Sequence, residues 1–404
     1  MDRRHSRMRP LIVALVLLLV TTGCWDLKEV EELRFTVGEG LDRAEEETPG
    51  DEWAAEGGGY KKRNLILFTQ QLALPEFIAA AGKQNGGQQQ KPYQNIVLTG
   101  DSTFQMASEP SLGHQGGTFG QHLKVLVIGE ALARTVNLQQ LLNEYFRSPT
   151  VRRSVLVFIA RGRAKDTLET QEPGEIPSFR LVDIADNEKE TTRLLPPMNL
   201  GKVNSKLAAE SSFLLQSIAS KAGIVKFIGA AVIKGKTKKL IGFLSEEELE
   251  GLNWLTGQGG GGAIKAVYEE QRQPAVYMID KLNSHIHPRV EGNRISFDVG
   301  IEFEGRLIED WAIPGNAFES KHLKKVEKAF HDEVRKRVDR SLNKIQHEYQ
   351  ADVAGFGNQL RIRYPEVWEK VKKDWDKEFS RARIKYTVTI QIRDFGTQGS
   401  KLKE

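Results

Sequence analysis

A run of glycines at residues 257–262 is the segment of this sequence most similar to a phosphate-binding loop. Such a loop needs a strand before it, the N-terminus of a helix after it, and normally a lysine followed by Ser or Thr. Here an acidic, amphipathic helical stretch precedes the glycines, and no lysine–hydroxyl pair follows them. We therefore predict a mobile surface loop at this position.

Histidine, carboxylate and serine side chains are the other groups of this chain that could act in catalysis or bind a metal. His285 and His287 alternate along an expected strand and share one face, but the spacing fixes no third metal ligand, so we predict that both face solvent. Acidic residues at 298, 302, 304, 309 and 310 follow a strand period, which is typical of a hydrated face. Ser211 and Ser212 lack the Gly-x-Ser-x-Gly elbow of hydrolases. The sequence thus predicts a non-enzymatic protein without a metal or cofactor site.

The residue best placed for a covalent reaction is Cys24, the one cysteine of the 404 residues. A basic segment at residues 3–9 and an apolar run at residues 11–20 precede it, which is the layout of a secretory signal. Ten apolar residues rise only about 15 Å as a helix, too short to cross a hydrocarbon core of about 30 Å. We therefore expect export and removal of the leader.

Thr21, Thr22, Gly23 and Cys24 close this leader and resemble the bacterial lipobox, in which the cysteine thiol takes a diacylglycerol after cleavage before it. We expect cleavage between Gly23 and Cys24, a thioether-linked diacylglycerol and an additional N-acyl chain such as palmitate. Two or three acyl chains hold a protein on a membrane almost permanently. Lipoboxes usually carry Leu three residues before the cysteine, where this chain has Thr21.

Composition supports a globular protein that does not bind nucleic acid. The chain is 39% hydrophobic and 28% charged, and its formal net charge of +4 includes +3 from residues 1–23, which leaves +1 for the mature part. A nearly neutral chain lacks the summed field that drives binding to phosphate backbones.

The periodicity of apolar residues predicts an α/β (α+β) multi-domain fold with mixed sheets and flanking helices. Apolar strands at 122–129 and 155–160 flank a helical pattern at 130–146, as in a βαβ unit. Further along, we expect a helix over 206–222, a hairpin of strands 224–233 and 240–244, and an antiparallel sheet from 277–290, 294–304 and 384–392.

Apolar residues spaced by three or four predict one long helix over residues 319–354, ended by Gly355 and Gly357. Its polar face is basic, and we single out a candidate partner or membrane surface there, against the alternative of an ordinary solvated face. The residues proposed for this surface are Lys324, Lys325, Lys328, Arg335 and Lys336, and Arg337 and Arg340 extend the same face. A second helix over 365–378 should bury Trp368 and Trp375 in the core.

We divide the chain at shifts in composition into five parts. These are a lipoprotein signal peptide (1–23), an N-terminal α/β domain (24–197), a middle domain (198–283), a C-terminal α+β domain (284–396) with the long helix, and a tail (397–404). Residues 43–59 are acidic and residues 82–92 are rich in Gln and Gly, so both are predicted as solvated insertions.

Several segments together resemble the Ger(x)C family of spore germination lipoproteins, the C subunits of nutrient germinant receptors. They comprise the Gly-Cys-Trp-Asp sequence at 23–26 with Glu-Glu-Leu at 31–33, residues 120–133, residues 155–168, the hairpin at 229–235 and 240–244, and the closing segments 352–357 and 364–375. The resemblance covers nearly the whole mature chain. The lipobox Thr21 and the two insertions depart from the family pattern.

This resemblance implies a three-domain lipoprotein on the outer face of the spore inner membrane, without a catalytic residue. It also implies integral membrane A and B subunits as partners, in a complex that responds to nutrients such as amino acids or sugars. Two alternatives remain at this point. One is an extracytoplasmic solute-binding lipoprotein that captures the germinant directly, and the other is a cell-wall hydrolase.

Overall fold

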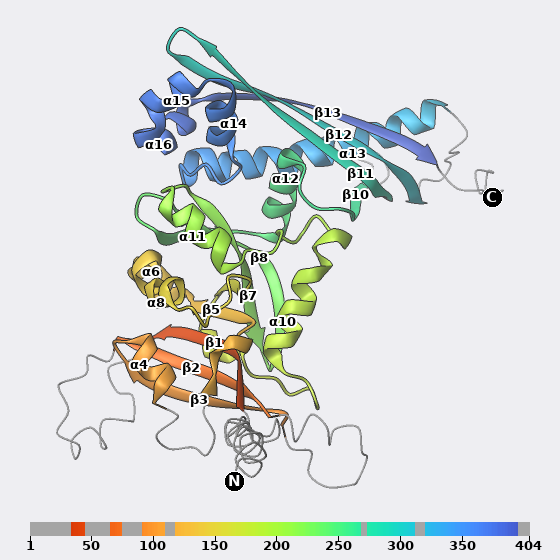
Figure 1. Cartoon of the computed structure of the whole chain (residues 1–404). Coiled ribbons are helices and arrows are strands. Elements are labelled where there is room, and N and C mark those ends of the chain that lie inside the picture. Colours follow the sequence, from red (N-terminus) through yellow and green to blue (C-terminus); the bar gives the residue numbers. More distant parts are fainter. Residues whose placement is uncertain are drawn as a thin grey trace, which may run out of the picture.

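The computed structural model of the chain describes residues 34–44, 65–74, 91–109, 118–267, 273–311 and 320–394 (Figure 1). Two sheets organise these residues, one of nine strands built from residues 34–244 and one of four strands built from residues 263–394. In Figure 1 the first sheet lies in the lower half of an elongated molecule and the second lies at the top. Cys24 and most of the two predicted insertions lie outside the described residues.

The first sheet is mixed, with strand order β3-β2-β1-β5-β6-β7-β8-β9 and the short β4 beside β1. Neighbours β1, β5, β6 and β7 pair in parallel, whereas β2, β3, β8 and β9 pair antiparallel. The strands are β1 (Arg34–Arg43), β2 (Ile66–Ala73), β3 (Tyr93–Gly100), β4 (Thr118–Phe119), β5 (Val125–Gly129), β6 (Leu156–Ala160), β7 (Phe213–Lys221), β8 (Ile224–Lys234) and β9 (Lys239–Leu244).

Helices cover both faces of this sheet, which is why its central parallel strands β5 and β6 are almost entirely apolar. One core forms under α6 (Glu130–Thr135), α7 (Leu138–Leu141), α8 (Asn143–Arg147) and α11 (Leu200–Ala208). A second core forms under α9 (Ala164–Thr167) and α10 (Pro177–Asp186) on the other face. At the β3 end of the sheet, α4 (Thr103–Ser108) begins at its N-cap residue Ser102 and packs on β2 and β3.

The predicted βαβ unit is present, since β5 and β6 are parallel and helices connect them. Its helical segment is divided into three short helices rather than one. Asn137 accounts for the first break, because its side chain accepts hydrogen bonds from the backbone N–H groups of Gln139 and Gln140 and starts α7 anew.

The helix predicted over residues 206–222 is wrong beyond Ala208, where α11 ends. Residues Phe213–Lys221 form β7, which lies inside the sheet between β6 and β8. An apolar run of this length fits a buried strand as well as a helix, so its periodicity could not separate the two. The predicted hairpin is confirmed as β8 and β9. The domain limits stay predictions. The predicted border after residue 197 falls within the first sheet, because β6, before the border, pairs with β7, after it.

The second sheet has the order β10-β11-β12-β13, with β10 (Ala263–Val267), β11 (Pro274–Glu291), β12 (Arg294–Asp310) and β13 (Arg383–Asp394). The prediction of an antiparallel sheet is wrong for its last strand, because β13 pairs with β12 in parallel. The long helix α13 (Ser320–Asn343) crosses one face of the sheet between β12 and β13 and returns the chain to the same end. Val326, Phe330 and Val334 of α13 belong to the buried core of this face.

The long helix is shorter than predicted. After α13 the chain continues as a π-helical turn (Lys344–Glu348), and Gln350 adopts a φ of 48°, in the left-handed region that ends a helix. Gly355 does not terminate this helix but precedes the next one, α14 (Phe356–Arg363). The predicted second helix is divided into α15 (Pro365–Val371), a 3-10 turn (Lys372–Asp374) and α16 (Trp375–Arg381).

One helix, α12 (Glu246–Thr256), lies between the two sheets and packs on both β8 and α13 (Figure 1). Ser245 and Glu248 form a capping box at its start, and Gly257, with a φ of 69°, ends it. Gly251 lies so close to α13 that an added Cβ would be 2.5 Å from the backbone oxygen of Arg337. Among the described residues, no helix has the length and apolar character to cross a bilayer.

Candidate functional site

The residues predicted to be processed and lipidated, Gly23 and Cys24, lie outside the described residues, so this modification stays a prediction. The described chain starts ten residues later at Arg34, the first residue of β1. In Figure 1 the β1, β2 and β3 region lies at the end of the molecule opposite the second sheet. A tether near Arg34 would therefore hold the molecule by the first sheet.

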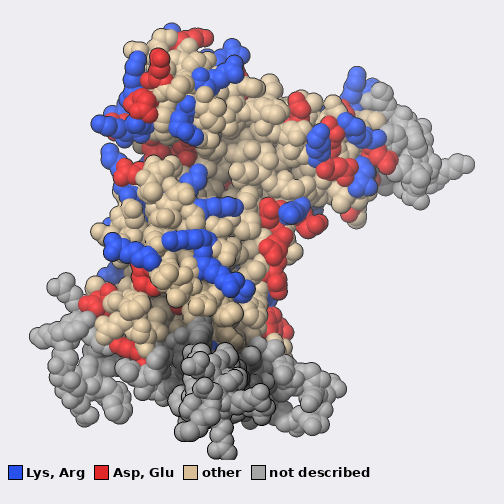
Figure 2. All heavy atoms as spheres, in the orientation of Figure 1, with Lys and Arg blue, Asp and Glu red and all other residues tan. Residues whose placement is uncertain are grey.

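Acidic residues of the same helix pair with two of the five cations proposed for the basic face of α13. Lys324, Lys325, Lys328, Arg335 and Lys336 are exposed, as expected, but Lys328 pairs with Asp332 at 2.6 Å and Lys336 with Glu333 at 3.6 Å. Figure 2 shows acidic and basic side chains mixed at the end of the molecule where α13 begins. Arg335 lies over the Tyr386 ring, with 6.0 Å between its guanidinium carbon and the ring centroid.

Arg337 is not on the solvated face where the sequence placed it. It is 7% exposed and forms an ion pair with Glu250 of α12, which is buried, and a second ion pair with Glu333 at 2.8 Å. Thr192 also donates a hydrogen bond to Glu250. Because α12 approaches α13 closely at Gly251, this arginine points into the interface between the two helices. It contributes to packing between the two sheets rather than to a free basic surface.

A hollow of about 500 Å³ opens beside this ion pair, lined by Arg161, Arg193, Arg337, Ser245 and the first glutamates of α12. The guanidinium of Arg161 lies 4.4 Å from the ring centroid of Phe243. Arg193 is 3.5 Å from Glu250. Since Glu250 already compensates two of the three arginines, this hollow is an ion cluster at the junction of the two sheets.

A second polar network fastens the β8–β9 hairpin to the C-terminal helices. Asp376 of α16 pairs with Lys234 at 2.9 Å and accepts a hydrogen bond from Ser212 at 3.0 Å. The Tyr349 hydroxyl makes hydrogen bonds with both the backbone N–H and the backbone oxygen of Phe243 in β9. Ser212, considered above as a nucleophile, is therefore part of this joint.

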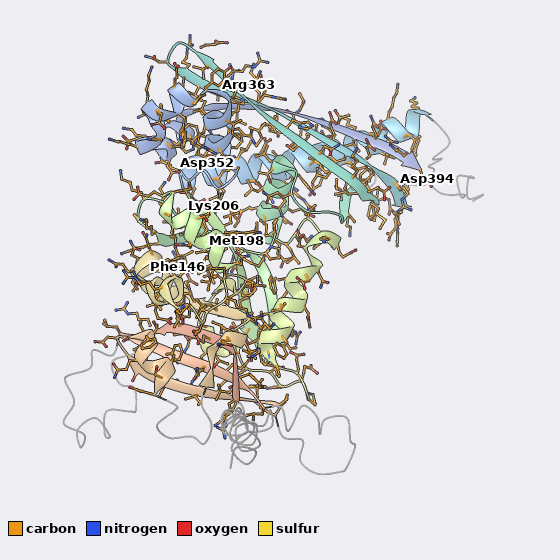
Figure 3. All side chains as sticks on the ribbon, viewed as in Figure 1. Phe146, Met198, Lys206, Asp352, Arg363 and Asp394 are labelled. Atoms are coloured by element: carbon orange, nitrogen blue, oxygen red, sulfur yellow. The ribbon has the colours of Figure 1, made fainter. Side chains whose placement is uncertain are left out.

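Asp352 organises the start of α14, next to the same joint (Figure 3). Its carboxylate accepts hydrogen bonds from the backbone N–H groups of Gly355, Phe356 and Gly357 and from Nε1 of Trp375 at 2.7 Å. Burial raises the pKa of Asp352, although these four donors favour its ionised form. Trp375 is 8% exposed and contacts Trp368 edge-to-face, so the predicted core position of Trp375 is confirmed.

The first sheet contains two buried carboxylates that the sequence did not single out. Asp42 of β1 accepts backbone hydrogen bonds from Ala164 at 2.6 Å and Lys165 at 3.0 Å, and so anchors the first turn of α9. Glu39, three residues earlier on β1, accepts a hydrogen bond from the Tyr145 hydroxyl at 2.6 Å. Burial, partly opposed by the Tyr145 hydrogen bond, raises the pKa of Glu39 from 4.5 to about 7. No periodic signal in the sequence marks either residue.

Most of the predicted solvated groups of the second sheet lie on its open face, but the side chain of Asp310 is only 16% exposed and contacts His322 of α13. His285 and His287 are exposed, with ring centroids 6.4 Å apart. Glu304 pairs with Arg393 at 2.9 Å, and Asp310 with His322 at 2.6 Å. Across the part of the chain that the structure describes, no three His, Cys, Asp or Glu residues gather as metal ligands would. The glycines at 259 and 260 lie against the backbone of residues 189–192 rather than at the N-terminus of a helix.

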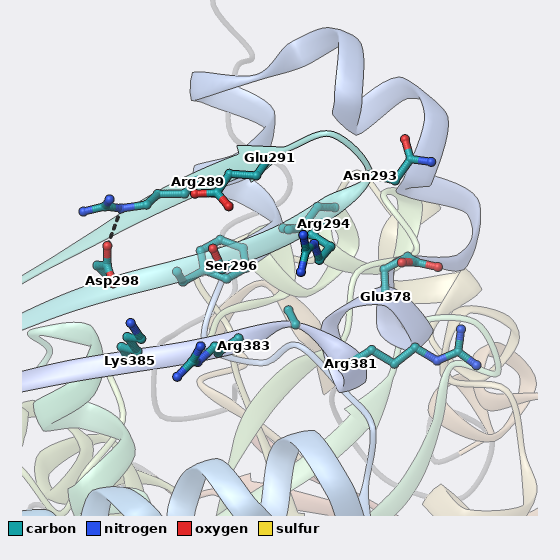
Figure 4. Close-up of a pocket in the computed structure, with 13 residues that line it drawn as sticks. Arg289, Glu291, Asn293, Arg294, Ser296, Asp298, Glu378, Arg381, Arg383 and Lys385 are labelled. Carbon is teal, nitrogen blue, oxygen red and sulfur yellow. Dashed lines mark ion pairs between the residues drawn. The ribbon is translucent and has the colours of Figure 1, made fainter.

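At the far end of this sheet, around the β11–β12 turn, lies a hollow of about 430 Å³ (Figure 4). Five cationic side chains line it, together with Glu291, Asp298 and Glu378. The cations are Arg289, Arg294, Arg381, Arg383 and Lys385. Of these, Arg289 forms an ion pair with Asp298. Positive charge is therefore in excess at this end of the molecule.

Comparison with known proteins covers both halves of the chain. Residues 26–220 match the family described as spore germination protein N-terminal domain, and residues 228–396 match the family described as spore germination B3/GerAC like, C-terminal.

Individual relatives give the same result over the full length. The chain is 42% identical to spore germination protein YndF of Bacillus subtilis (strain 168) over 402 residues, covering 98% of this chain and 99% of the relative. It is 30% identical to spore germination protein B3 of the same organism, covering 96% of this chain and 98% of that protein. A solved structure titled the GerBC protein matches with a TM-score of 0.60 and 26% identity, covering 83% of this chain and 97% of that one.

Proposed function

Because this chain belongs to the Ger(x)C family of spore germination proteins, we propose that it is the lipid-anchored, non-catalytic subunit of a germinant receptor. In this role it lies outside the cytoplasm on the spore inner membrane and acts with integral membrane A and B subunits. It scaffolds these subunits or transmits their signal when a nutrient triggers germination. The observation that carries the proposal is the match of both halves, in order, to spore germination families.

The lipid anchor is the most specific part of the proposal, and Cys24 with its leader supports it. Two or more acyl chains, at about 0.8 kcal/mol per buried methylene, give practically irreversible membrane binding. A tether at Cys24 would reach Arg34 through ten residues, at most about 35 Å of extended chain. The first sheet would then lie near the membrane and the second sheet away from it.

A structural role for the buried charges supports the absence of catalysis. Asp42, Glu250 and Asp352 each accept hydrogen bonds or ion pairs from groups that join elements of the fold. These carboxylates act as structural acceptors inside packed interfaces. The proposed function therefore depends on surfaces rather than on a reaction centre.

The test is the Cys24→Ala variant, expressed in sporulating cells in place of the natural chain. We expect its release from the membrane fraction and a large loss of nutrient-triggered germination, while germination triggered without nutrients continues. Thr21→Leu, which restores the usual lipobox residue, is the matched control and should keep both membrane retention and germination. Full membrane retention together with normal germination of the Cys24→Ala variant would contradict the proposal.

A further inference from the structure

The end of the second sheet at the β11–β12 turn aligns cationic residues on neighbouring strands. Ser296 of β12 lies opposite Arg289 on one side and Arg383 of β13 on the other. Two residues further along the same strands, Asp298 of β12 lies opposite Lys385 of β13. Paired residues on adjacent strands have side chains about 5 Å apart on the same face. Arg294 and Arg381 complete the cluster from the ends of β12 and α16 (Figure 4).

Most of the positive charge of this cluster is not compensated by an ion pair within the described residues. Arg289 has its ion pair with Asp298, but none of Arg294, Arg381, Arg383 and Lys385 forms an ion pair with another described residue. All four are exposed. Arg383 and Lys385 are two residues apart on one strand, so both point to the same face about 6.6 Å apart and repel each other. An acidic ligand would relieve this repulsion.

The same residues lie on the last strand of the sheet. β13 is 12 residues long, and β12 pairs with only one of its edges; no strand of the described chain pairs with the other. An unpaired edge presents backbone N–H and C=O groups to which an extended peptide can add. α13 covers one face of β13, while the alternate face, with Arg383 and Lys385, is open.

We propose that β13 and this cationic cluster bind an extended, acidic segment of a partner protein. The segment adds to the free edge of β13, and its carboxylates, at alternate positions, face Arg383 and Lys385. Alternate residues of a strand repeat every 6.6–6.8 Å on either chain, so successive carboxylates match successive cations. Arg294 and Arg381 take a further carboxylate at the end of the segment.

The position of the cluster favours a protein partner over the membrane. It lies on the second sheet, at the end of the molecule opposite β1, β2 and β3 (Figure 1). This step rests on the proposed tether at Cys24, which would keep the first sheet near the bilayer. The cations also extend over β12, β13 and the end of α16, a wider area than one phosphate group can contact.

The test uses a fluorescein-labelled peptide in which glutamates alternate with Thr and Val residues. Fluorescence anisotropy measures the binding of this peptide to the full chain in neutral detergent. We expect saturable binding that weakens with salt and is at least tenfold weaker for Arg383→Glu/Lys385→Glu. Lys370→Glu/Lys373→Glu on the nearby helices changes the net charge equally and should alter the affinity less than twofold. Hydrogen exchange of β13 amides should slow when the peptide binds to the natural chain.

Equal affinity for a peptide with the same glutamates in one block, or unchanged exchange in β13, would overturn strand addition. Equal loss of binding in both double variants would overturn the assignment of the site. Binding of the chain to phosphatidylglycerol vesicles that is lost in Arg383→Glu/Lys385→Glu, without peptide binding, would assign the cluster to lipid instead. None of these measurements needs a lipid on Cys24, so failure here is distinct from failure of the proposed function.

Discussion

Replacement of Glu39 by Gln should remove a large part of the pH dependence of stability in the first sheet. Glu39 is 6% exposed on β1, and its one side-chain hydrogen bond comes from the Tyr145 hydroxyl. Its pKa of about 7 in the folded chain is above the ordinary value of 4.5. The folded chain therefore keeps a proton that the unfolded chain releases over this pH range.

The sign and size of the effect follow from this difference in pKa. Below pH 4.5 the carboxyl is protonated in both states and all of its contribution to stability is present. As the pH rises to 7, the unfolded carboxyl ionises first, so the free energy of unfolding falls by about 1.4 kcal/mol per pH unit and then levels off. From the two pKa values we expect the free energy of unfolding to be lower than at acidic pH by about 1.4 kcal/mol at pH 5.5 and by about 3 kcal/mol at pH 8.

Hydrogen exchange of peptides from β1 and β5, compared between the natural chain and Glu39→Gln at each pH, measures this effect locally. Glutamine cannot ionise and can still accept from Tyr145. The stability of the variant relative to the natural chain should therefore increase by about 2 kcal/mol between pH 5.5 and pH 8. Tyr145→Phe removes the hydrogen bond that favours the ionised form of Glu39. The pKa of Glu39 should therefore rise further, and the loss of stability should level off at a higher pH. A relative stability that does not change with pH would refute the assignment of a raised pKa to Glu39.

Two further substitutions test the buried charges of the second sheet by calorimetric unfolding. Arg337→Met leaves Glu250 buried without its main partner, so it should lower the free energy of unfolding by about 3–5 kcal/mol. The double variant Arg337→Met/Glu250→Met should recover most of this stability. The exposed pair Arg340–Glu247 is the control, and Arg340→Met should cost less than about 1 kcal/mol; equal costs for the two arginines would contradict the burial argument. Asp352→Ala removes the acceptor of hydrogen bonds from three backbone N–H groups and from Trp375. It should lower the free energy of unfolding by about 3 kcal/mol. An unchanged melting temperature would show that the N-terminus of α14 does not need this carboxylate.

The sequence predicted the local elements where periodicity is strong and length distinguishes helix from strand. The βαβ unit, the β8–β9 hairpin, α12 and the core of α13 are examples. It did not predict β7, because a strand buried on both faces carries no alternation. It also missed the parallel pairing of β13, because the direction of pairing depends on the crossover of α13 and not on the strand itself.

Contacts between side chains from distant parts of the sequence were not predicted. The cations of α13 are exposed as expected, but the sequence could not show which of them meet a carboxylate from another element, as Arg337 does from Glu250. The cations near the β11–β12 turn come from residues 289–294 and 381–385, nearly a hundred positions apart, and only strand register brings them together. Charge patterns along a chain report such clusters only when they lie on one helix or one strand.

The family comparison places a border between residues 220 and 228, yet the hairpin of β7 and β8 crosses that border inside the nine-stranded sheet. The segments that match two different families therefore contribute hydrogen-bonded strands to one sheet. Separation of the chain there would leave β7 and β8 each with an unpaired edge, to which strands of other chains can add. Chimaeras between paralogues should for this reason be joined after Leu244, the last residue of β9, where the sheet is complete and before the N-cap residue of α12.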